Sequence, residues 1–212
     1  AFRGYQSKQL KLDNVQIIGA YAFAGNNSLS SLDLPNLKYL GANAFESNTS
    51  LSQVTLANVK TISSRAFDNC PLISAEISSA EIIGSNAFYN MSNLTQVDLQ
   101  QAQIIGQSAF YGTGLTTLNA PNLEQVNDYA FSRSNLKTIV LPSVVEIRDN
   151  AFSNNTTLTQ ITLSSCIDFI DEDAFNNIAQ NATFNVYAGI GEKFARENDF
   201  KIKLLGQSTT FE

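Results

Sequence analysis

Apolar residues recur along this chain with a period of about 22 positions. An Ala-Phe pair occurs eight times after the first few residues, and its phenylalanines are spaced 21 to 23 residues apart. An Ile, Leu or Val precedes each Phe by five positions, and another apolar residue precedes it by eight. A period of about 20 to 50 residues predicts a solenoid of stacked units. The phenylalanines of these pairs are Phe23, Phe45, Phe67, Phe88, Phe110, Phe131, Phe152 and Phe175.

Each repeat also contains a short run that predicts a β-strand. Runs such as "LSSLDL" (29–34), "LSQVTL" (51–56) and "LTQVDL" (94–99) end in the order apolar, polar, apolar. This alternation is typical of a strand with one buried face. We therefore expect each unit to contain this strand, a turn, a second short extended piece, a helical turn that carries Ala-Phe, and a loop. One unit cannot bury its own apolar face, so neighbouring units must share a core.

Two further positions of the repeat indicate how its turns are built. Glycine stands four residues before the Phe in four copies, which predicts a tight or left-handed corner, although Arg148 occupies the same place in another copy. Asparagine stands nine residues before the Phe in several copies, and we expect a buried ladder of these amides to satisfy turn carbonyls. The positions concerned are Gly19, Gly41, Gly84 and Gly106, and Asn14, Asn36, Asn58 and Asn122.

Composition narrows the class of function. Of the 212 residues, 43% are hydrophobic, so the chain folds into a globular structure. Only 15% are charged and the net charge is −6, which argues against a nucleic acid or an anionic membrane as partner. No apolar run approaches the roughly 20 residues of a membrane span. Because the chain has no histidine and no visible nucleophile–base pair, we expect no enzymatic activity and no metal or other cofactor.

Two segments carry a resemblance to a known family. The stretches "LDLPNLKYLGANAFESNTSLSQVTL" (32–56) and "LPSVVEIRDNAFSNNTTLTQITL" (141–163) resemble the BspA-like leucine-rich repeat family of surface proteins. The resemblance implies a strand-rich α/β fold, a right-handed solenoid with a parallel concave sheet and short helical turns on its convex side. It also implies that the protein lies at the cell surface or is secreted, and that it binds a protein of the host matrix or of another cell's surface.

The two ends of the chain differ. We expect the solenoid to cover residues 1–187 in about nine coils, of which the first is partial because "AF" at 1–2 matches the middle of a repeat. This partial coil predicts a longer parent chain and offers a surface for end-to-end self-association. Residues 188–212 are expected to form a C-terminal cap and tail, with a short amphipathic helix in "AGIGEKFARENDF" (188–200).

The outward positions of the predicted strands form the candidate binding site. Small hydroxyl and amide side chains in these rows donate and accept hydrogen bonds without the desolvation cost of a charge. We weigh a protein ligand above a glycan, and weigh both against a sheet face that is merely soluble. Glu76 and Asp98 are expected on adjacent coils, where their carboxylates could approach to about 5 Å, and a solvated pair is favoured over a calcium or acid–base site. The candidate residues are Asp33, Gln53, Thr55, Glu76, Gln96, Asp98, Thr117 and Asn119.

Three further expectations remain. The repeats are alternatively a structural stalk that presents another domain of a longer surface protein.

Cys70 and Cys166 lie four coils, roughly 19 Å, apart. Because a disulfide requires Cα atoms within about 7 Å, both thiols should be free. Seven asparagines stand in N-x-Ser/Thr sequons, namely Asn26, Asn48, Asn90, Asn93, Asn154, Asn155 and Asn181.

Overall fold

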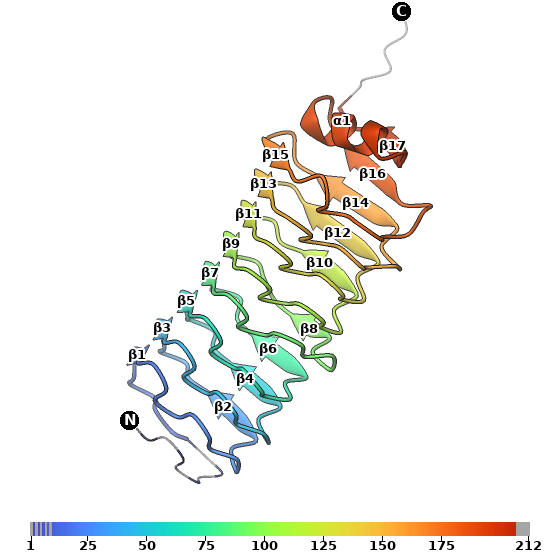
Figure 1. Ribbon diagram of the computed structural model, residues 1–212. Helices are drawn as coiled ribbons and strands as arrows, with labels where there is room; N and C mark the ends of the chain where they lie inside the picture. Colours follow the sequence, from blue (N-terminus) through green and yellow to red (C-terminus); the bar gives the residue numbers. More distant parts are fainter. Residues whose placement is uncertain (1, 3, 5, 7, 9, 207–212) are drawn as a thin grey trace, which may run out of the picture.

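The computed structural model describes residues 2, 4, 6, 8 and 10–206. The chain winds into a solenoid of about nine coils, with parallel strands on two sides and one short helix at the C-terminal end (Figure 1). The predicted solenoid is therefore confirmed. The tail at 207–212 and the odd-numbered residues 1–9 of the predicted partial coil lie outside the described residues. The predicted division of the chain at residue 187 stays a prediction.

One side of the solenoid is a continuous ladder of eight two-residue strands, which we call the narrow sheet. Each strand contributes one inward residue to the core and one outward residue to the surface. All neighbours pair in parallel and in register. The strands are β1 (Ile17–Ile18), β3 (Tyr39–Leu40), β5 (Thr61–Ile62), β7 (Ile82–Ile83), β9 (Ile104–Ile105), β11 (Gln125–Val126), β13 (Glu146–Ile147) and β15 (Phe169–Ile170).

The second side contains the strands that the sequence predicts, and we call its outer surface the broad face. The strands form two parallel sheets, because the ladder is interrupted between β8 and β10. The first sheet comprises β2 (Ser31–Asp33), β4 (Gln53–Thr55), β6 (Ser74–Glu76) and β8 (Gln96–Val97). The second comprises β10 (Thr117–Asn119), β12 (Thr138–Leu141), β14 (Gln160–Leu163), β16 (Thr183–Val186) and β17 (Lys201–Leu204).

The core is built around a column of stacked phenylalanine rings. Rings of neighbouring coils lie nearly parallel from Phe2 to Phe175, with centroids 5.1 to 5.9 Å apart. From Phe45 to Phe152 these side chains are fully buried, and so are the alanines before them. Stacked aromatic pairs add stabilisation beyond the area they bury. The once-per-coil repetition of Ala-Phe therefore exists because each ring packs on the equivalent ring of the next coil.

The segment around Ala-Phe differs from the predicted helical turn. It is a run of hydrogen-bonded turns with left-handed residues two positions before and after the Phe, such as Asn43 (φ 55°) and Ser47 (φ 57°). The Phe45 N–H donates to Ala66 O of the next coil at 2.9 Å, whereas the Ala44 N–H closes a turn on Gly41 O at 3.3 Å. A helix would keep its N–H groups within the coil. Alternate N–H groups instead form a third ladder between coils.

The corner glycines act through close approach rather than through a left-handed backbone. The residues with positive φ do not include Gly41, and a Cβ atom there would lie 2.6 Å from Ala20 N and from Gly19 C. Glycine therefore lets this corner rest directly on the backbone of the preceding coil. The left-handed residues lie two places further on, and they are Tyr21, Asn43, Arg65, Asn86, Ser108, Tyr129 and Asn150.

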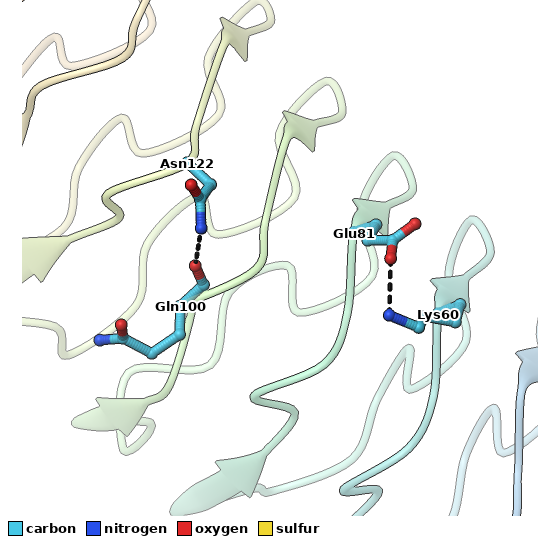
Figure 2. A network of polar contacts seen from close by, with 4 residues as sticks. All are labelled: Lys60, Glu81, Gln100 and Asn122. Carbon is cyan, nitrogen blue, oxygen red and sulfur yellow. Dashed lines mark hydrogen bonds and ion pairs between the residues drawn. The ribbon is translucent and has the colours of Figure 1, made fainter.

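Two sets of amide and hydroxyl side chains bind turn carbonyls. The asparagines nine residues before the Phe are exposed, whereas the sequence predicted that they would be buried. They nevertheless bind turn carbonyls as expected: Asn122 Nδ2 donates to Gln100 O at 2.7 Å (Figure 2). Asn36 and Asn58 do the same to the coil before them. A buried set three residues after the Phe was not foreseen. There, Asn155 Nδ2 donates to Phe131 O and Phe152 O, both at 2.8 Å.

The C-terminal end is covered by a helix and one additional strand. Helix α1 (Ile190–Glu197) buries Phe194 and Ala195 against the last coil, as its amphipathic pattern predicts. Strand β17 was not predicted, and it pairs with β16 along four residues. The Phe194 ring closes the phenylalanine column with tilted contacts to Phe175 and Phe184, and Phe200 stacks on Phe184. A membrane-crossing helix is absent from the part of the chain that the structure describes.

The two cysteines are free, as predicted, but their surroundings differ. Cys70 is buried in the core, where desolvation raises the pKa of its thiol from 9.0 to about 12. Cys166 is exposed. Among the sequon asparagines, Asn26, Asn48 and Asn155 are buried, so a glycan cannot be accommodated on them in the folded chain.

Shortening one ring of the phenylalanine column should destabilise the whole solenoid. We expect Phe110→Ala to lower the free energy of unfolding by about 3–5 kcal/mol, because it empties a fully buried site and removes two stacking contacts. Urea denaturation followed by circular dichroism measures the change. Ile73→Ala is the matched control, since Ile73 is 51% exposed and its truncation should change stability by less than about 1 kcal/mol. Equal effects of the two substitutions would contradict the packing described here.

The two thiols should react at very different rates. In the native protein at pH 8, we expect a disulfide reagent to modify Cys166 rapidly and Cys70 only after denaturation, because Cys70 is buried and its pKa is about 12. The unfolded Cys70 thiol ionises near 9.0, so raising the pH above that value should favour the unfolded chain. In Cys166→Ser the rapid phase should vanish. Two rapidly reacting thiols in the native protein would show that Cys70 is accessible.

Candidate functional site

The outward residues of the broad face lie in rows, as the strand alternation predicts. Asp33 pairs with Thr55, and Thr55 with Glu76, along one row. Gln53, Ser74 and Gln96 occupy equivalent places in a second row. The residues between them, such as Val54 and Ala75, are buried. The sequence therefore placed these side chains correctly on the surface, and their role in binding stays a prediction.

The structure brings four of the candidate residues together at the interruption of the ladder. Figure 1 shows β8 and β10 set further apart than the other neighbouring strands of this side. A pocket of about 420 Å³ lies there. It is lined by the candidate residues Glu76, Gln96, Asp98 and Thr117, together with Ser74, Ala75, Thr95, Val97 and Leu115. We call this pocket the β8–β10 opening.

The lining of the β8–β10 opening is acidic at its rim and apolar at its floor. Val97 is half-buried, whereas the equivalent Val54 is 2% exposed, so the opening uncovers part of the core-facing side of β8. Glu76 and Asp98 supply two carboxylates, and no lysine or arginine is among the lining residues. This combination suits a side chain with an apolar stem and a positively charged head.

The two carboxylates accept hydrogen bonds from different neighbours. Glu76 Oε2 accepts a hydrogen bond from Thr55 Oγ1 at 3.4 Å, and Asp98 Oδ1 accepts one from the Gln100 N–H at 3.0 Å. Each acid is thus oriented by its own neighbour. The remaining candidates lie further along the broad face: Asp33, Gln53 and Thr55 towards the N-terminal end, and Asn119 on β10.

Sequence reasoning missed the opening because it depends on how two coils lie against each other. One signal was present in the loop before β10, which contains both Gly112 and Gly114. A Cβ atom at Gly114 would lie 2.4 Å from Ser92 O, so only glycine allows this loop to approach the preceding coil so closely. The strands that follow the two loops then diverge into separate sheets.

A carboxylate cluster in the Ala-Phe turn segments was also missed as a cluster. Oxygen atoms of Asp149, Asp171 and Asp173 lie within 4.8 Å of one another. The Asp173 N–H donates to Asp171 Oδ1 at 3.0 Å, and Asn150 and Asn176 donate to Asp149 and Asp173. The Asp149 charge also raises the pKa of the nearby Tyr129. These acids are therefore tied into the hydrogen bonds of their own turns.

Comparisons with solved structures find several similar chains. A leucine-rich repeat protein of T. pallidum, TpLRR, is 19% identical, with 93% of this chain and 84% of that chain covered and a TM-score of 0.52. A leucine-rich cell surface protein of Faecalibacterium prausnitzii is 19% identical; the match covers 94% of this chain and 65% of that chain, with a TM-score of 0.47. The pneumococcal vaccine antigen PcpA is 16% identical; the match covers 97% of this chain and 75% of that chain, with a TM-score of 0.42.

The sequence itself matches a family model. The model describes a BspA-type leucine-rich repeat region, and its matches, at residues 1–95 and 81–194, include six copies of the repeat. No curated protein matches the chain. The matched residues cover most of the solenoid, including β2 to β16 and both edges of the β8–β10 opening. On this evidence, the chain belongs to the BspA-type leucine-rich repeat family.

Proposed function

We propose that the chain is a non-enzymatic binding module of a cell-surface or secreted protein, and that its broad face recognises a protein ligand. Family membership supports a protein-interaction or surface module. The observation that carries the proposal is the β8–β10 opening, because it is a pocket in the middle of an otherwise closed polar sheet face. The candidate residues of the sequence surround this pocket on both sides.

Rigidity makes such a face suitable for recognition. The outward side chains stand on strands that pair with both neighbouring coils over most of the ladder. A surface that is already ordered loses little conformational entropy when it binds. Amide and hydroxyl groups such as those of the exposed Gln53 and Gln96 and the half-buried Thr55 supply hydrogen bonds around the opening without introducing a strong local charge.

The opening favours a protein over a glycan. A lysine or arginine of the ligand would lay its methylene stem over Val97 and Leu115 and direct its charge towards Glu76 and Asp98. A basic side chain that fills a pocket is a common anchor of protein interfaces. A neutral sugar gains nothing from the two carboxylates beyond hydrogen bonding. The ligand surface should therefore present a basic residue near its centre.

The alternative function is a spacer that presents another domain. The rod-like stack of coils in Figure 1 is compatible with this role. A spacer has no need for a pocket on its surface, whereas a binding module does. The two functions differ in whether the isolated chain binds any ligand.

Reversing the charge of the opening should weaken binding. Surface plasmon resonance with immobilised fibronectin, laminin and collagen provides matrix-protein probes. For any probe that the natural chain binds, we expect Glu76→Lys combined with Asp98→Lys to weaken affinity at least about tenfold, because a basic anchor then meets two positive charges. Glu172→Lys combined with Glu197→Lys is the matched control, since both residues are exposed away from the broad face and the change in net charge is the same.

Two results would count against the proposal. Unchanged affinity of the Glu76/Asp98 variant for a confirmed ligand would remove the opening from the binding site. Absence of binding to every matrix probe by the natural chain would favour the spacer.

A further inference from the structure

The outer surface of the narrow sheet is unusually apolar. Its outward row contains one residue from each strand, and four large apolar members are well exposed: Ile17 by 69%, Tyr39 by 43%, Ile82 by 42% and Phe169 by 41%. Large apolar side chains that are exposed on one face often mark an interaction site. The full row is Ile17, Tyr39, Thr61, Ile82, Ile104, Gln125, Glu146 and Phe169.

Charges beside this row change sign along the solenoid. The charged residues directly before the strands are Lys38 and Lys60 before β3 and β5, and then Glu81, Glu124 and Asp168 before β7, β11 and β15. Lys60 Nζ already contacts Glu81 Oε1 of the next coil at 2.6 Å (Figure 2). This ion pair is exposed, so it contributes little by itself and leaves Lys60 available for a further carboxylate.

The row is complementary to itself when reversed. The strands follow one another at about 4.8 Å, so a two-fold axis between β7 and β9 brings strand positions of one copy opposite those of another. Ile82 then faces Ile104 at the centre, and Ile17 faces Phe169 at the ends. Lys60 of one copy then lies opposite Glu124 of the other. Lys38 lies opposite the coil of β13, where the Glu146 carboxylate is already bound at 2.5 Å by Arg148 of its own chain.

We propose that a second copy of this chain covers the narrow sheet in antiparallel orientation, so that the chain forms a side-by-side homodimer. A parallel arrangement would place Lys38 and Lys60 of one copy opposite the same lysines of the other, and acids opposite acids, so the two copies would repel each other. End-to-end stacking through the first coil would leave the apolar row in water. The broad face points elsewhere and remains open on both copies, so this inference extends beyond the proposed function.

The interface should be modest in strength. Eight strands at about 4.8 Å make a contact about 34 Å long, only about two side chains wide. Interfaces at the lower end of the usual size range are generally weak and transient. We therefore expect a dimer that dissociates in the micromolar range or above, and that weakens at high salt because a charge pair contributes.

Charge reversal tests both the dimer and its orientation. Sedimentation velocity of the whole chain over a range of concentrations gives the dimer dissociation constant. We expect Lys60→Glu or Glu124→Lys alone to raise that constant about tenfold, and the double variant to return within about twofold of the natural value, because the reversed charges meet again. Lys137→Glu is the matched control, since Lys137 is exposed outside the narrow sheet.

A second variant tests the apolar centre. Ile82→Glu should abolish dimerisation without unfolding the chain, because the side chain points outward and is 42% exposed; far-ultraviolet circular dichroism checks the fold. A chain that remains monomeric at every concentration would overturn the proposal. So would association that is insensitive to Lys60→Glu and Ile82→Glu, since it would indicate end-to-end contact or another surface.

Discussion

Every feature of this molecule depends on one constraint, the in-register stacking of each coil on the next. The backbone of a coil is hydrogen-bonded to its neighbour on the narrow sheet, along most of the broad face and through alternate N–H groups of the Ala-Phe turn. The phenylalanine column fills the space that these three ladders enclose. Because a single coil has no closed core, the free energy of folding resides mainly in the contacts between coils.

Stacking in register also converts sequence repetition into surface. A residue type that occurs once per coil becomes a row about 4.8 Å in spacing, whichever side of the solenoid it occupies. The same rule produces two faces of different chemistry, a polar broad face and a largely apolar narrow sheet with lysines at one end and acids at the other. Departures from the rule then become features in their own right. The β8–β10 opening is such a departure, and it lies where the loop with Gly112 and Gly114 precedes β10.

The periodic part of the sequence was sufficient to predict the solenoid, the phenylalanine core and the outward rows of the broad face. These depend on one repeat and its equivalent in the next coil. The predictions failed where structure depends on details between coils. The turn around Phe45 takes left-handed residues because alternate N–H groups bind the next coil, and glycine is used at Gly41 for close approach. Strand β17 and the opening have no counterpart in the repeat, so no periodic signal marks them.

Native-state hydrogen exchange resolved by residue tests the stacking constraint most directly. If alternate N–H groups of the Ala-Phe turn bind the next coil, the amides of Phe45, Phe88 and Phe131 should exchange as slowly as those of the central strands. They should also open together with the neighbouring coil. Rapid exchange of these phenylalanine amides beside protected strands would show that the turns are not joined between coils, and would contradict the account.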